Sequence, residues 1–162
     1  MRKKGFSLIE LLIVVAIILI IAAIAIPNLL RSRIAANEAS ATASMRTVNT
    51  AEITYSSTYN SGFTDTLNQL GTPASGQPDA NNSDLTDPVL SGKQSGQTRS
   101  FTKNGYSFTY LPSGTYGFIA TFSLNADPVA RGSSGQRSFF TDQSSVIRAN
   151  ATAVATVSDN PI

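Results

Sequence analysis

An apolar run near the N-terminus constrains this chain more than any other feature of its sequence. From Phe6 to Ile26 every residue is apolar except Ser7 and Glu10. An α-helix needs about 20 mainly apolar residues to cross the hydrocarbon core of a bilayer. We therefore expect residues 6–27 to form one membrane-spanning helix.

The positive charge of the chain is concentrated ahead of this run. Without Arg2, Lys3 and Lys4, the 12 Lys and Arg residues fall to 9, against 10 Asp and Glu residues. Basic residues beside a spanning helix favour the cytoplasmic side, so we expect a cytoplasmic N-terminus and a translocated remainder. The basic excess belongs to residues 1–5, which argues against nucleic-acid binding through bulk charge.

An ordinary signal peptide does not account for this start. Its apolar region has 7–15 residues and is followed by a small-residue cleavage site, whereas this run is longer and continues into PNLLRSR. An uncleaved membrane anchor fits the length but leaves Glu10 unexplained. A charged side chain at the centre of a spanning helix costs about 2.5–3.5 kcal/mol on insertion scales and usually has a function.

The residues around the start of the run form a recognisable set. A short basic leader ends at Gly5, Phe6 follows directly, Glu10 lies within the run, and Pro27 lies near its end. In these features KKGFSLIELLIVVAIILIIAAIAIPNLLRSR resembles the N-terminal segment of type IV pilins and of the pseudopilins of type II secretion. The resemblance implies that a prepilin peptidase cleaves between Gly5 and Phe6 and N-methylates Phe6.

The resemblance also implies a role for Glu10 in assembly. Its carboxylate would meet the N-terminal amine of Phe6 in a neighbouring subunit, because two buried ions are tolerated as a hydrogen-bonded pair. Subunits would form a homopolymer through their N-terminal helices, in which small residues permit close approach: Ala16, Ala22, Ala23 and Ala25. Other implied partners are the lipid bilayer before assembly and the inner-membrane pilus or secretion assembly machinery.

The helix is expected to continue beyond the membrane. Pro27 predicts a kink, but no Gly or Pro occurs from Asn28 to Tyr59, so the helix should run on. Residues 28–60 would be its amphipathic half, with an apolar stripe that packs on a sheet: Ile34, Ala41, Met45, Val48, Tyr55 and Tyr59. Glu38 and Glu52 interrupt this stripe, which disfavours a coiled coil.

Residues 61–162 are expected to form a globular head. After Asn60-Ser61-Gly62 ends the helix, a short helical turn at Thr64–Leu70 precedes a long loop at 71–100, with an ordered piece near Leu85–Leu90. Strand patterns then occupy about 101–149: Phe101–Tyr110, Tyr116–Leu124 with LPSGT as the linking hairpin turn, and Arg137–Ala149 as a third strand or a hairpin. The predicted fold class is α+β, a long N-terminal helix packed on an antiparallel sheet of three to four strands, followed by a partly loose tail at 150–162.

The head shows no enzyme active site, and we expect no cofactor and no metal. The absence of Cys and His excludes His-based triads, zinc sites with nitrogen or sulfur ligands, and a C-terminal disulfide. The C-terminus would therefore be held by sheet pairing alone.

Three weaker patterns in the head have simple explanations that we favour. The acids Asp79, Asp84 and Asp87 with Asn81 and Asn82 lack EF-hand spacing and suit a solvated loop, while Asp127 and Asp142 are isolated. A set of aromatic residues suits core packing better than nucleic-acid stacking or electron transfer: Tyr55, Tyr59, Phe63, Tyr106, Tyr110 and Tyr116. Asn81-Asn82-Ser83 and Asn150-Ala151-Thr152 match the N-glycosylation tripeptide, which also occurs by chance.

These observations favour a structural subunit that polymerises into an extracellular pilus serving adhesion, twitching motility or DNA uptake. The chain would be a single-pass inner-membrane protein before assembly. One alternative is a pseudopilin that forms a periplasmic pseudopilus for type II secretion. Another is a membrane-anchored binding protein that never polymerises.

Overall fold

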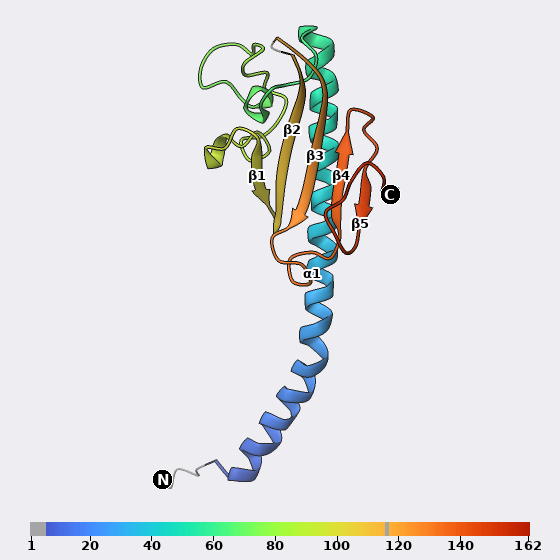
Figure 1. Cartoon of the computed structure of the whole chain (residues 1–162). Coiled ribbons are helices and arrows are strands. Elements are labelled where there is room, and N and C mark those ends of the chain that lie inside the picture. Colours follow the sequence, from blue (N-terminus) through green and yellow to red (C-terminus); the bar gives the residue numbers. More distant parts are fainter. Residues whose placement is uncertain (1–5, 116) are drawn as a thin grey trace. The chain divides into compact units, whose positions relative to one another are not determined.

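A computed structural model describes residues 6–115 and 117–162 of the chain (Figure 1). The chain divides into two compact units, one ending at Arg33 and the other comprising Ile34–Ile162. A single helix, α1 (Leu8–Tyr59), runs through both. Two 3-10 helices and six strands follow: η1 (Leu67–Leu70), η2 (Lys93–Ser95), β1 (Ser100–Lys103), β2 (Tyr106–Thr115), β3 (Phe118–Pro128), β4 (Ser138–Asp142), β5 (Arg148–Asn150) and β6 (Asn160–Pro161).

The first unit is the N-terminal part of α1 and is apolar on all sides. Among residues 6–115 and 117–162, one helix is long and apolar enough to cross a membrane, and its most apolar window has no buried residues. Pro27 lies inside α1 without ending it, in keeping with the absence of further helix breakers. The kink at Pro27 stays a prediction.

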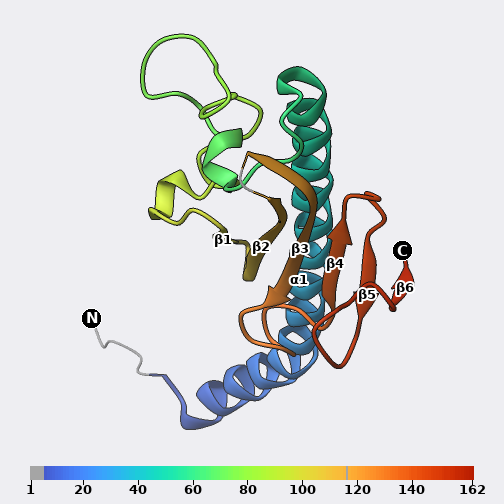
Figure 2. The same ribbon diagram turned by 45° about the horizontal axis from the view of Figure 1, so that its top comes forward.

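In the second unit, α1 packs on an antiparallel sheet, which confirms the predicted fold class. The six strands lie in chain order, and each pairs with the next in antiparallel register. Figures 1 and 2 show the strands side by side along this part of the helix. The core between helix and sheet contains most of the predicted stripe together with the inward residues of β1–β4: Ala41, Met45, Val48 and Tyr55 from α1, and Phe101, Tyr106, Phe108, Tyr110, Phe122, Leu124 and Phe139 from the strands.

The sheet has more strands than the three to four expected, partly because a turn divides the first predicted strand. Asn104 and Gly105 both have positive φ, +47° and +75°, and Lys103 pairs with Tyr106 across them. A two-residue turn with this conformation is the tight hairpin turn for which Asn-Gly is the strongest local signal. The expectation of one strand at Phe101–Tyr110 overlooked this signal.

The predicted hairpin turn at LPSGT is wrong, because these residues lie within β2. Pro112 pairs with Phe122 of β3, and the pairing continues to Thr115 with Phe118. Tyr116 lies outside the described residues. β1 ends its pairing at Ser100 with Thr109, so β2 borders no described strand on that side from Leu111 onward. Proline is tolerated in such an edge stretch because no ladder hydrogen bond is lost there.

The remaining strands come from the C-terminal segment. The region predicted as a third strand or a hairpin forms the hairpin of β4 and β5, and β6 extends the sheet within the tail expected to be partly loose. The N–H of Ile162 donates to the Ile147 carbonyl oxygen at 3.0 Å. The tail is therefore held to the sheet.

Candidate assembly and processing site

The predicted processing site lies at the start of α1. Phe6 precedes the helix and is 85% exposed, while Gly5 lies outside the described residues. Ser7 occupies the position before the first helical residue, Leu8. The backbone N–H of Ser7 donates to Glu10 Oε2 at 2.8 Å.

This contact gives Glu10 a local role that our reading of the sequence missed. Ser7-Leu8-Ile9-Glu10 has the Ser-x-x-Glu pattern of a capping box, in which the glutamate three residues into a helix accepts from the N–H of the capping residue. A neutral N–H donor offsets little of the cost of a carboxylate at membrane depth. Glu10 Oε1 accepts no hydrogen bond from the described residues, so one oxygen remains available for a cation. The assembly role of Phe6 and Glu10 stays a prediction.

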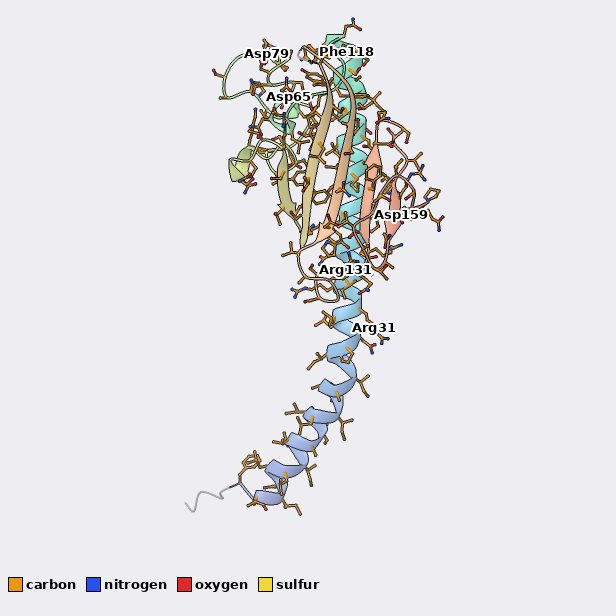
Figure 3. All side chains as sticks on the ribbon, in the orientation of Figure 1. Arg31, Asp65, Asp79, Phe118, Arg131 and Asp159 are labelled. Atoms are coloured by element: carbon orange, nitrogen blue, oxygen red, sulfur yellow. The ribbon has the colours of Figure 1, made fainter. Side chains whose placement is uncertain are left out.

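The surface that follows Glu10 is one of large exposed aliphatic side chains (Figure 3). Exposed side chains extend from the start of the helix to beyond Pro27, for example Leu12, Ile18 and Leu29 at 58–72% exposure. Water does not stabilise such a surface, so it has to be covered by lipid or protein.

In the head, Glu52 lies on the buried face of α1 instead of merely interrupting its apolar stripe. It is 0% exposed. The Thr64 N–H donates to Glu52 Oε2 at 3.0 Å and the Thr64 hydroxyl donates to Oε1 at 2.5 Å, while the Tyr110 hydroxyl donates to the Thr64 carbonyl oxygen at 2.8 Å. Burial raises the pKa of Glu52 to about 7, although the hydrogen bonds from Thr64 act in the opposite direction.

Glu38 is the second acid on the buried face, and it binds the segment before β4. Its Oε1 accepts from the N–H groups of Gln136 and Arg137, both at 3.0 Å, and its Oε2 from Arg137 Nε at 2.8 Å. Burial opposes ionisation, but these backbone donors and the Arg137 guanidinium together lower the pKa of Glu38.

An arginine clamp also holds the C-terminal segment, so sheet pairing alone does not close the head. Arg131 Nη1 donates to the carbonyl oxygens of Gln136 and Ala151, the latter at 3.0 Å. Its Nη2 donates to Ser138 Oγ at 2.7 Å and to the Ala153 carbonyl oxygen at 3.2 Å. One exposed side chain thus joins the loop after β3 to the segment after β5, in a chain without cysteine.

The aromatic residues and the acids that the sequence analysis singled out in the head make contacts within the fold. Tyr106 and Tyr110 are buried and Tyr55 packs on Tyr59 at 4.9 Å between ring centroids, so these rings form core contacts; Tyr116 lies outside the described residues. Asp79 and Asp87 accept backbone N–H groups within their own turns. Within the described residues no three acids gather into a metal-binding group.

Comparison with known proteins identifies the N-terminal segment. A family model for the prokaryotic N-terminal methylation motif matches residues 1–26. The chain is 62% identical over 42 residues to the type IV wide pilus major component PilA4 of Thermus thermophilus, a match covering 26% of this chain and 32% of that protein. It is 40% identical over 70 residues to the type IV major pilin protein PilA of Myxococcus xanthus, covering 43% of this chain and 31% of that protein.

Each match spans about a third of the relative's length, and no solved structure matches the chain significantly. The match whose position is defined is that of the methylation motif, at residues 1–26. These are the residues that carry Phe6 and Glu10. In this motif and in these partial matches, the chain is similar to two proteins named as major subunits of type IV pili.

Proposed function

We propose that this chain is a structural subunit of a type IV pilus. Prepilin peptidase removes residues 1–5 and methylates Phe6, and the mature subunits polymerise through their N-terminal helices into an extracellular filament. The filament serves adhesion, twitching motility or DNA uptake. The exposed apolar helix with Glu10 near its start, whose first residues lie within a methylation motif, is the observation that carries the proposal.

Physical chemistry favours assembly over permanent anchoring. Before assembly the apolar helix rests in the inner membrane with its N-terminus cytoplasmic. Packing against the N-terminal helices of other subunits replaces lipid contacts with protein contacts. A salt bridge between Glu10 and the methylated Phe6 amine of a neighbouring subunit neutralises two charges that are costly in lipid. An unpolymerised anchor would leave that carboxylate with only the Ser7 N–H.

A substitution at Glu10 separates the intermolecular role from the local one. Glu10→Gln keeps an oxygen that accepts from Ser7 N–H, so the helix start is preserved, but it removes the negative charge. We expect a variant that is cleaved, methylated and inserted into the membrane but forms no filament by electron microscopy. Normal filaments from Glu10→Gln would contradict the charge-pairing part of the proposal.

The N-terminus of the purified protein tests processing independently. Mass spectrometry should find N-methyl-phenylalanine at Phe6 as the first residue. An intact Met1, or a cut elsewhere, would favour the non-polymerising anchor. Ser7→Ala is a suitable control, because it leaves both the backbone N–H and the charge of Glu10 in place.

A pseudopilin would have the same kind of N-terminal helix as a pilin, so the phenotype of the cells has to distinguish the two functions. The names of both relatives refer to type IV pili, which supports the pilus. Long surface fibres that contain the chain would agree with this proposal. Loss of secreted proteins on deletion, without any loss of surface fibres, would instead indicate a pseudopilus.

A further inference from the structure

A shallow groove lies on α1 around Pro27 and the turn after it. It has a volume of about 320 Å³ and is lined by Ile26, Leu29, Leu30 and Arg33. These positions follow the spacing i, i+3, i+4 and i+7, so they share one face of the helix. The three aliphatic side chains are 41–72% exposed. The groove belongs entirely to the first unit, which ends at Arg33.

Arg33 supplies the charged wall of this groove. A helical side chain leans toward the N-terminus and covers the turn before its own Cα, so Arg33 lies over the two leucines of the groove. Arg31 and Arg33 are the only charged residues between Glu10 and Glu38, and both are exposed. The salt bridges among residues 6–115 and 117–162 include neither arginine. The guanidinium of Arg33 is therefore available for an anion from outside the chain.

The position of the groove along α1 matches the boundary of a bilayer. At 1.5 Å per residue, Arg33 lies about 38 Å along the helix from Leu8, its first residue. The hydrocarbon core of a bilayer is about 30 Å thick, and the headgroup layers extend it to about 40–45 Å. The guanidinium thus reaches the phosphate layer on the translocated side, while the aliphatic walls reach the acyl chains. This placement rests on the proposed function, in which α1 begins in the inner membrane.

We propose that this groove binds one anionic phospholipid. The guanidinium of Arg33 donates two parallel hydrogen bonds to the lipid phosphate, a geometry that suits arginine better than lysine. One acyl chain lies against Ile26, Leu29 and Leu30. A zwitterionic headgroup carries its own ammonium group, which competes with Arg33 for the phosphate, so the site prefers a headgroup with net negative charge. The bound lipid fixes the depth of α1 in the membrane before assembly.

Arg31 provides a matched control within the same helix. Two residues of an α-helix correspond to a rotation of about 200°, so Arg31 projects from the side of α1 opposite Arg33 (Figure 3). It has the same charge and nearly the same depth, but it does not line the groove. General attraction between basic residues and anionic headgroups acts on both arginines. A groove that binds lipid depends on Arg33 alone.

The experiment places the full chain at a low protein-to-lipid ratio in phosphatidylcholine vesicles that contain phosphatidylglycerol with a photoactivatable acyl chain. After irradiation, peptide mass spectrometry should find the lipid attached within residues 26–30. Unlabelled phosphatidylglycerol should compete, whereas added phosphatidylcholine and inorganic phosphate should not. Arg33→Gln should reduce labelling about tenfold, and Arg33→Lys, which keeps the charge without the fork, about threefold. Arg31→Gln should change labelling less than about twofold.

Other outcomes overturn the inference in distinguishable ways. Equal losses for Arg31→Gln and Arg33→Gln would show general headgroup attraction without a groove. Competition by inorganic phosphate would exclude the lipid as the specific ligand, and cross-links between two copies at residues 26–30, in place of lipid, would assign the groove to a second copy of the chain. All three leave the pilus proposal intact. Extraction of the unmodified chain from the vesicles by alkaline carbonate would instead contradict the membrane helix of the proposed function.

Discussion

Glu52 and Thr64 form a buried pair in which one residue supplies two donors to the two oxygens of the other. The Thr64 N–H and hydroxyl bind Glu52 Oε2 and Oε1 at 3.0 and 2.5 Å, and no salt bridge of the described residues involves Glu52. A buried carboxylate without a cation favours its protonated form. The pair thus joins the end of α1 to the segment that follows it through a group sensitive to pH.

We expect the stability of the head to fall as pH rises through neutrality. The pKa of Glu52 is about 7 in the folded protein against an ordinary value of 4.5, so the folded state binds this proton more tightly than the unfolded state. Stability is therefore highest below about pH 4.5 for this group and is lost up to and beyond pH 7, by on the order of 3 kcal/mol. Thermal unfolding of the full chain in detergent, followed by circular dichroism between pH 5 and 8, measures this loss. Glu52→Gln should flatten the profile, and an unchanged slope would contradict the assignment.

Glu38 should act with the opposite sign at acid pH. Its pKa is lowered in the folded protein, so its contribution is present above the ordinary value of 4.5 and is lost as pH falls below it. Glu38→Ala removes three hydrogen bonds and should cost about 2 kcal/mol. Glu38→Gln keeps an acceptor for the backbone N–H groups and should cost about 1 kcal/mol, because the partly exposed Arg137 pair is weak. Urea titration of both variants tests this order; equal costs would show that the ion pair dominates.

Gly62 should tolerate no side chain. Its φ is +78°, and a Cβ would overlap the Ile119 carbonyl oxygen, the acceptor for the Phe63 N–H at 2.9 Å. Gly62→Ala combines backbone strain with displacement of β3 and should cost about 3 kcal/mol or more. Gly76 is a matched control, since its φ is +89° but open space surrounds it. Gly76→Ala should cost about 1 kcal/mol, and a similar loss for both variants would rule out the steric contribution.

Arg131 should control local opening of the C-terminal strands. Arg131→Met removes the donors to Ala151 and Ala153 and should destabilise this region by about 1.4 kcal/mol, equivalent to tenfold faster hydrogen exchange. The backbone N–H groups of residues 148–160 should show the change, while those of β2 and β3 should not. Arg46→Met replaces an exposed arginine on α1 and should leave exchange unchanged. Faster exchange throughout the sheet would instead indicate global destabilisation.

Much of the architecture follows from local sequence signals. The absence of Gly and Pro from Asn28 to Tyr59 predicted a helix that continues beyond Pro27, and alternating aromatic residues predicted strands in the right region. The Asn104-Gly105 pair is also a local signal for a hairpin turn, but the proline and glycine of LPSGT led to a turn being predicted there instead. That choice failed because the pairing partners of β2, and not its composition, decide whether Pro112 lies at an edge.

The sequence by itself determined the apolar N-terminal part of α1, because the length and apolarity of one continuous segment are local properties of the chain. Only the tertiary structure decided the partners of the head's polar groups. Glu38 meets Arg137 across 99 positions, and Asn49 meets Thr141 across 92. No local propensity encodes such contacts, because they arise when α1 and the sheet bury a shared core.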